Sequence, residues 1–359
     1  MRKRIAAAAP ASVIAATRSA PVVSAVVPPA IRTMAGLAVA VVLLAGCGGA
    51  PTRDASGAAP ATSHAPAGQT EVQFTGLHAP NGVAVDVQGN VYVSDAQNHR
   101  VVKLDKAGTQ TVLPFTGLRG PGPLAVDKDG NVYVADHYWP SQIWKLPAGS
   151  STPVMLANTA QECRPEGGGC AVEGLSTDDA GNLYVSEQEG CWYDQARVFK
   201  MDAPVSTASH RTTLSFNGLH LPMSPVEDKD GNVYVIDHAW KADPAYVAQC
   251  PPHPPRVLKL TPSGVQTDLP FTSLQWPQFG LAVDGQGNVY VSNLGLYPTF
   301  NTVGDRPMPV QVLKLTPSGT QTVLPFEGLN WATYMAVAPD GALYLSDTDN
   351  NRVLKLGIS

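Results

Sequence analysis

The stretch Gly89-Asn90-Val91-Tyr92-Val93 decides the fold, because nearly the same five residues return five times along the chain. The later copies begin at Gly130, Gly181, Gly231, Gly287 and, in the weaker form Gly-Ala-Leu-Tyr-Leu, at Gly341. Successive copies lie 41, 51, 50, 56 and 54 residues apart (130 − 89 = 41 for the first pair). A unit of this length that recurs is typical of a repeat architecture. Gly-Asn suits a tight turn and Val-Tyr-Val suits a half-buried pleat, so each copy predicts a β-strand.

Each copy has the same neighbours. An apolar stretch that ends in aspartate precedes it, as in Gly82-Val83-Ala84-Val85-Asp86. A stretch led by Arg or Gln follows it, as in Arg100-Val101-Val102-Lys103-Leu104, and a fourth comes at residues 109–114. Four short antiparallel strands per unit make one blade of a β-propeller. The six copies therefore predict an all-β protein with six four-stranded blades.

The sixth unit ends after its third strand, at Leu356. The missing fourth strand has a match at the other end of the domain. Thr70-Glu71-Val72-Gln73-Phe74-Thr75-Gly76-Leu77 is similar to Thr322-Val323-Leu324-Pro325-Phe326-Glu327-Gly328-Leu329, which holds a fourth strand. We therefore expect the N-terminal strand to complete the last blade, which closes the ring and removes an open sheet edge. The propeller is predicted to span residues 70–359.

These elements resemble the NHL-repeat family of propellers. The stretch Thr111-Val112-Leu113-Pro114-Phe115-Thr116-Gly117-Leu118, followed by the Val-Asp, Gly-Asn-Val-Tyr-Val and Arg-Val-Val-Lys-Leu elements, also resembles the extracellular sensor domain of mycobacterial receptor Ser/Thr protein kinases. The resemblance covers roughly residues 70–359. It implies a six-bladed propeller that binds or senses a ligand. No kinase segment precedes the propeller in this sequence, so we expect sensing without a kinase in the same chain.

The first 46 residues carry five basic residues and no acidic ones, and the apolar run 37–45 leads into Leu44-Ala45-Gly46-Cys47. This pattern is typical of a secretory leader. Its ending resembles the bacterial lipobox, which implies that Cys47 is lipidated. We predict a lipoprotein signal peptide over residues 1–46, a disordered tether over residues 47–69, and a location on the outer side of the cell membrane. A transmembrane anchor is the alternative, although the run is short for a span of about 20 residues.

Charge limits the classes of partner. Without the leader the chain has 24 − 5 = 19 basic and 29 acidic residues, a net charge of −10. An acidic chain without a basic run argues against nucleic acid. The expected partners are the membrane, through the lipid anchor, and a protein, a glycan or a small molecule.

The longest departures from the repeat connect strands 2 and 3 of a blade or lead into the next blade. In a propeller these connections share one face, which we call the loop face. Binding residues gather on loops held by a rigid scaffold, and Trp and Tyr supply large contact areas. The sequence therefore predicts a binding, sensor or scaffold module with these contact residues: Trp139, Glu173, Trp192, Tyr193, Trp240 and Tyr297. The alternative is that the rings form a second core beneath the loops.

The mouth of the central channel opens on the loop face. Its aligned positions are Asn81, Gly122, Glu173, Met223, Phe279 and Thr333. A resemblance to calcium-dependent lactonases of the gluconolactonase type implies a hard cation held here by carboxylate and amide oxygens. Asn81 and Glu173 would supply two ligands, yet Ca²⁺ takes six to eight. We predict no cofactor and no catalytic residue, and keep a metal-dependent lactonase or lyase as the alternative.

Zinc is the second metal to consider, because Asp136-His137 and Asp237-His238 resemble the zinc region of NHL-type amidating lyases. The acid before each histidine recurs, however, in most blades. The equivalent residues are Asp95, Asp136, Glu187, Asp237, Asn293 and Asp347. A position repeated in every blade is predicted to cap a turn or to pair with the following arginine.

Four cysteines remain after Cys47, and all four lie in loop-face insertions. Export permits disulfides, and four cysteines allow three connectivities. We favour Cys163–Cys170, which closes a short Gly-rich loop, and Cys191–Cys250, which ties the loops of neighbouring blades. A Cys170–Cys191 pairing and four free thiols are the alternatives.

Overall fold

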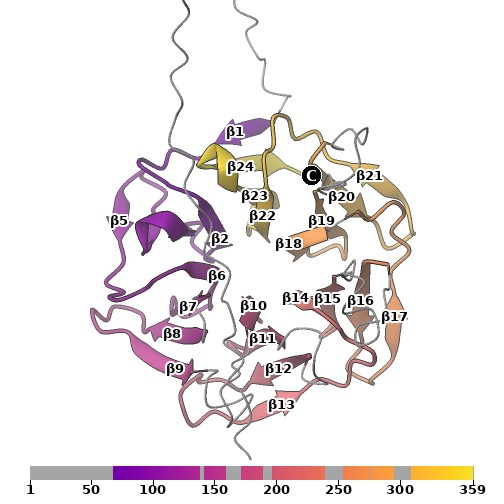
Figure 1. The fold of residues 1–359 in the computed structure, drawn as a ribbon, viewed down its shortest axis with the longest axis horizontal. Helices are drawn as coiled ribbons and strands as arrows, with labels where there is room; N and C mark the ends of the chain where they lie inside the picture. The colour runs from indigo at the N-terminus through magenta and orange to yellow at the C-terminus, as the bar shows by residue number, and fades with distance from the viewer. Residues whose placement is uncertain are drawn as a thin grey trace, which may run out of the picture. The chain divides into compact units, whose positions relative to one another are not determined.

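The computed structural model describes residues 68–137, 141–158, 171–188, 196–238, 254–275, 277–294 and 309–358. All of them lie in the second of the two compact units into which the chain divides. Their strands form six four-stranded antiparallel sheets around a common axis (Figure 1). The first strand of each sheet contacts the first strands of the sheets on either side, and blade 6 contacts blade 1. The predicted six-bladed, all-β propeller is therefore confirmed.

The blades follow one another along the chain. Blade 1 holds β2 (Pro80–Val85), β3 (Val91–Asp95), β4 (Arg100–Leu104) and β5 (Gln110–Val112). Blade 2 holds β6 (Pro121–Val126), β7 (Val132–Asp136), β8 (Gln142–Leu146) and β9 (Val154–Asn158). Blade 3 holds β10 (Ala171–Thr177), β11 (Leu183–Gln188), β12 (Arg197–Met201) and β13 (Arg211–Thr213). Blade 4 holds β14 (Pro222–Glu227), β15 (Val233–Asp237), β16 (Arg256–Leu260) and β17 (Gln266–Asp268).

Blade 5 holds β18 (Pro277–Val283), β19 (Val289–Asn293), β20 (Gln311–Leu315) and β21 (Gln321–Val323). Blade 6 holds β22 (Ala332–Val337), β23 (Ala342–Asp347) and β24 (Arg352–Gly357). Two short 3-10 helices, η1 (Ala96–Asn98) and η2 (Thr348–Asn350), connect strands 2 and 3 of blades 1 and 6. Among these described elements, no helix has the length and apolar character needed to cross a membrane.

The N-terminal strand closes the ring. Strand β1 (Gln69–Glu71) pairs antiparallel with β24, with Gln69 opposite Leu356. The backbone N–H of Val72 extends the pairing by donating to the carbonyl of Val353 at 2.9 Å. Blade 6 thus takes its outer strand from the start of the domain, as the sequence predicted, although the strand begins one residue earlier.

The core lies between blades. All five residues of the second strand are buried in blade 1, because each sheet packs against its neighbours on both faces. Val83 and Val93 of blade 1, for example, join Tyr334 and Tyr344 of blade 6 in one apolar cluster. This double burial explains why the second strands are apolar at nearly every position. The outer strands, by contrast, expose side chains such as Val112.

The repeated Asp, Asn and Tyr form one local network. The Asp86 carboxylate accepts hydrogen bonds from the Asn90 backbone N–H (2.8 Å), the Asn90 side chain (2.7 Å) and the Tyr92 hydroxyl (3.0 Å). Gly89 takes φ = 81°, a conformation that side chains disfavour. Blades 2, 4 and 5 repeat the contacts. The aspartate carboxylate is thus engaged in hydrogen bonds within its own turn and the strand that follows.

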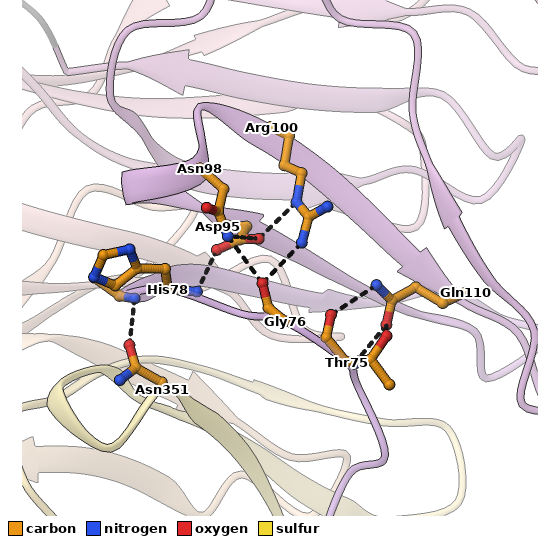
Figure 2. Close-up of polar contacts among 9 residues, drawn as sticks. Thr75, Gly76, His78, Asp95, Asn98, Arg100, Gln110 and Asn351 are labelled. Atoms are coloured by element: carbon orange, nitrogen blue, oxygen red, sulfur yellow. Dashed lines mark hydrogen bonds and ion pairs between the residues drawn. The ribbon is translucent and has the colours of Figure 1, made fainter.

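A glutamine in the outer strand holds the connection that enters its blade (Figure 2). The Gln110 side chain accepts a hydrogen bond from the Thr75 N–H (2.8 Å) and donates one to the Thr75 carbonyl (3.0 Å). The side-chain amide thus makes the same two hydrogen bonds that a backbone residue in a neighbouring strand would make. It extends the pairing of the sheet by one residue. The same pair of bonds joins Gln266 to Asn217, Gln321 to Thr272 and Gln69 to Glu327.

Candidate functional site: the channel mouth on the loop face

The acid that ends the second strand is a structural hub. Figure 2 shows Asp95 accepting from the His78 backbone N–H (2.7 Å), the Asn98 amide (2.8 Å) and Arg100 Nε (2.7 Å). Its side chain is fully buried. A buried carboxylate is stable only when it is paired and hydrogen-bonded, and here both conditions are met. Asp95 therefore ties the entry of its blade to the third strand.

The equivalent residues do the same work in other blades. Asp136 and Asp237 each accept from two backbone N–H groups of their entry loops. Glu187, Asp237 and Asp347 pair with the arginine of the third strand at 2.7, 2.9 and 2.7 Å. Asn293 accepts from the Gln275 N–H at 2.7 Å. The prediction that this position caps turns and pairs with arginine is confirmed. In the described part of the chain, no three His, Cys, Asp or Glu side chains are placed to hold a metal.

The mouth itself is built from pairs of residues, one pair per blade. Each aligned mouth residue is followed fifteen residues later by the residue just after the strand-2 acid (188 − 173 = 15). These partners are Ala96, His137, Gln188, His238, Leu294 and Thr348. We call the twelve residues the mouth ring. The regular spacing follows from the antiparallel register, which sets Pro80 opposite Asp95 and Pro121 opposite Asp136.

Three of these pairs are in direct contact. Gln188 donates to one carboxylate oxygen of Glu173 at 2.9 Å, and Thr333 and Thr348 share a hydrogen bond of 2.8 Å. The third pair fits by shape, since a Cβ on Gly122 would lie 2.6 Å from the His137 ring. Gly122 therefore permits the imidazole to lie over the inner strand of blade 2.

The floor of the mouth crosses the propeller axis. The Tyr334 hydroxyl, from blade 6, donates to the backbone carbonyl of Glu173 in blade 3 at 3.0 Å. The Phe279 ring stacks on Tyr334 with centroids 5.2 Å apart, and the His137 ring lies 6.4 Å from Phe279. Burial, and then the charge of Glu173, raise the pKa of Tyr334 well above its usual value. Tyr334 is thus a neutral donor that joins opposite sides of the ring.

The mouth ring contains buried polar atoms without a hydrogen-bond partner among the described residues, and these include the side-chain oxygen of Asn81 and Nε2 of His137. An unmade hydrogen bond at a buried polar atom costs about 1–3 kcal/mol, so such atoms in a folded protein call for an explanation. Both belong to the mouth ring.

The predicted site residues divide into two groups. Asn81 and Glu173 lie on the mouth ring, where their alignment placed them. The aromatic candidates Trp139, Trp192, Tyr193, Trp240 and Tyr297 lie outside the described residues. So do Cys47 and the proposed pairs Cys163–Cys170 and Cys191–Cys250. The sequence reasoning missed Gln188 and Tyr334, although the fifteen-residue spacing would have identified the former.

The opposite end of the propeller carries the turns between strands 1 and 2, and we call it the turn face. Glu227 ends β14 there, at a position that is Val or Thr in the other blades. It accepts a 2.7 Å hydrogen bond from the Tyr184 hydroxyl of blade 3, which lies farther, at 3.3 Å, from its own Asp178. Both side chains line a cavity of about 490 Å³. Burial raises the pKa of Glu227 to about 7, against the opposing effect of the Tyr184 hydrogen bond.

Glu227 should make stability depend on pH. Its pKa rises from 4.5 to about 7 on folding, so the folded chain holds the proton more tightly. This contribution is fully present below pH 4.5 and is lost as the pH rises through 7. The loss is on the order of 1 kcal/mol after allowance for solvent screening at this half-buried group. Urea unfolding at pH 5 and pH 8 should show it in the parent and not in Glu227→Gln.

The exposed Glu327→Gln is the matched control and should retain the parent's pH dependence. A Glu227→Gln protein that follows the parent at both pH values would show that this carboxyl does not titrate in the window.

Comparisons with known proteins agree with this architecture. The NHL-repeat family model matches residues 77–104 and 118–146. No curated protein matches the chain in sequence. A gluconolactonase from Xanthomonas campestris is similar in structure, with a TM-score of 0.58, 14% identity, and coverage of 80% of this chain and 89% of that one.

Two further solved structures are similar. One is the calcium-binding protein regucalcin from Agrobacterium tumefaciens, with a TM-score of 0.56, 15% identity, and coverage of 81% and 93% of the two chains. The other is a streptogramin B lyase, with a TM-score of 0.52, 14% identity, and coverage of 82% and 99%. At these identities the likeness shows a shared fold.

Proposed function

We propose that this chain is a binding module that presents its ligand surface on the loop face. The observation that carries the proposal is the floor at the axis. Tyr334 of blade 6 reaches Glu173 of blade 3 across the ring and Phe279 of blade 5 stacks on it, so side chains of three blades meet at the propeller axis. The repeated acids make hydrogen bonds and ion pairs that hold the blades together. The residues that differ between blades, and could therefore bind a specific ligand, lie in the mouth ring and the long insertions.

The proposal includes the setting of the module. Residues 1–46 are proposed to be a lipoprotein signal peptide, and Cys47 the lipidated residue that holds the propeller at the outer side of the cell membrane. The basic leader and its Leu-Ala-Gly-Cys ending support this. The resemblance to kinase sensor domains supports a role in sensing or as a scaffold, with a protein, a glycan or a small molecule as partner.

The double variant Trp192→Ala plus Trp240→Ala tests the binding surface. We expect it to lower partner capture at least tenfold, measured by crosslinking in intact cells and quantification of the crosslinked partner. The melting temperature should change by no more than about 2 °C, because exposed contact residues add little to folding.

The matched control removes exposed apolar side chains from the turn face, with Val87→Ala plus Val265→Ala. This variant should capture the partner as the parent does. A stability loss of about 3–5 kcal/mol per tryptophan, with capture unchanged, would show that the rings belong to a core.

A metal-dependent lactonase or lyase is the second candidate function. The observation that favours it is the Asn81 oxygen, which has no partner in the described part of the chain and lies on the same mouth ring as the Glu173 carboxylate. Similar structures include a gluconolactonase and a calcium-binding protein. Metal analysis of the purified protein separates the candidates: stoichiometric Ca or Zn that disappears in Glu173→Gln would favour the enzyme.

A further inference from the structure

We propose that the mouth ring binds an organic cation, an ammonium or guanidinium group, through Glu173, Asn81 and His137 against the ring of Phe279. The inference rests on the proposed function, because it names the chemistry that the loop face selects. It concerns residues that the structure describes, whereas the tryptophan test concerns the insertions around them.

The hydrogen-bonding character of the mouth points to a donor ligand. The Asn81 side-chain oxygen can only accept, and it has no partner among the described residues. Nε2 of His137 accepts when the imidazole proton is on the other nitrogen, and it is also without a partner there. Glu173 accepts one bond from Gln188, and an ionised carboxylate accepts several. These three groups can therefore accept hydrogen bonds from the N–H groups of a ligand.

These acceptors belong to one connected site. Glu173 is joined to Tyr334 by the bond across the axis, Tyr334 stacks on Phe279, and Phe279 contacts His137. Asn81 lies beside them, because its carbonyl accepts from Thr333 and its neighbour Gly82 approaches Gly122 closely. The acceptors of blades 1, 2 and 3 thus belong to one connected set of contacts around the propeller axis.

The charge of the mouth has the sign that a cation requires. Glu173 is the one carboxylate among the twelve mouth-ring residues, and none of the twelve is lysine or arginine. Burial first, and then this negative charge, raise the pKa of the Tyr334 hydroxyl. The nearby Arg119 is directed to Asp136 of its own blade, at 3.9 Å. Phe279 adds an aromatic face, which attracts ammonium and guanidinium groups.

An organic cation fits this ring better than a metal ion. Ca²⁺ takes six to eight oxygen ligands, and zinc in structural sites takes four nitrogen, sulfur or oxygen ligands. The ring offers a single carboxylate, and five of its twelve positions are apolar or carry no side chain: Ala96, Gly122, Met223, Phe279 and Leu294. An ammonium group needs three acceptors and tolerates an apolar wall.

The cation has two possible sources, a basic side chain of a protein partner or a free amine. The test uses the full-length purified chain and three probes: the N-acetylated and C-amidated peptide Gly-Gly-Lys-Gly-Gly, the same capped peptide with norleucine for lysine, and spermidine. Norleucine keeps the aliphatic chain and removes the charge. Binding is measured by saturation-transfer NMR and isothermal titration, at low salt and at high salt.

The lysine peptide or spermidine is expected to bind at least tenfold more tightly than the norleucine peptide, and less tightly at high salt. Glu173→Gln should weaken that binding at least tenfold, and its fold should persist because glutamine still accepts from Gln188. Asn81→Ala is the second variant; it removes an acceptor that has no partner among the described residues, so stability should not fall. Glu227→Gln, on the turn face, is the matched control and should bind as the parent does.

Binding of the peptide alone assigns the cation to a protein partner, and binding of spermidine alone assigns it to a free amine. Equal binding of the norleucine peptide, unchanged binding by Glu173→Gln, or no binding of any cation would overturn the inference. The proposed function falls separately, if the double tryptophan variant keeps full partner capture. If the double tryptophan variant loses partner capture but the parent binds none of the cationic probes, the proposal of a binding module is retained and the organic cation is rejected.

Discussion

Replacing Gly174 with alanine should lower the free energy of unfolding by about 3 kcal/mol or more. Gly174 lies in β10, and a Cβ there would come within 3.0 Å of the backbone N and Cα of Ser224 and of Cδ of Pro225. Those atoms belong to the inner strand of the next blade. In a closed ring that strand cannot retreat without displacing the other blades, so the clash cannot be relieved locally.

The measurement is urea unfolding of Gly174→Ala beside Gly285→Ala. Gly285 has no heavy atom within 4 Å of an added Cβ and no left-handed φ, so its substitution should change stability by no more than about 0.5 kcal/mol. Equal stability of the two variants would mean that the blades separate easily. Gly82 and Gly280 make the same close approach to blades 2 and 6, and their alanine variants should follow Gly174→Ala.

A chain that begins at residue 78 should melt roughly 10 °C below one that begins at residue 66. The shorter chain lacks β1 and the apolar side chains Val72, Phe74 and Leu77, which pack against the cluster between blades 1 and 6. It also exposes the backbone edge of β24, which invites aggregation.

Thermal unfolding followed by circular dichroism, with light scattering to detect association, compares the two chains. The chain beginning at residue 66 is its own control for removal of the leader and tether, and it should melt as the full-length chain does. Coincident melting curves for the chains beginning at 66 and 78 would show that the ring is stable without its N-terminal strand.

The blades could be predicted because each residue of the repeated motif makes its contacts with residues close to it in the sequence. Gly89 supplies a left-handed turn, Asn90 and Tyr92 donate to Asp86, and the valines alternate across a sheet packed on both faces. Such contacts span a few residues, so they leave a periodic trace in the sequence. Ring closure was also predictable, since the outer strand of blade 6 keeps the likeness to other outer strands.

The centre of the candidate site was not predictable in the same way. The contact between Tyr334 and Glu173 joins blades on opposite sides of the axis, and its length is set by the radius of the closed ring. No local pattern records that radius. Glu227 is similar: its acidity depends on Tyr184 of the neighbouring blade and on burial, and both appear only when the blades have packed.

The closing strand also has a consequence for biosynthesis. Gln69 bonds to Glu327 at a separation of 258 residues along the chain, and β1 pairs with β24, which is made last. The first strand of the domain to be synthesised is therefore the last to find its place. Until then the blades form an open arc with an unpaired edge, and such long-range pairing slows folding and prolongs exposure to aggregation. We therefore expect the chain to need chaperones during synthesis until β1 has paired with β24.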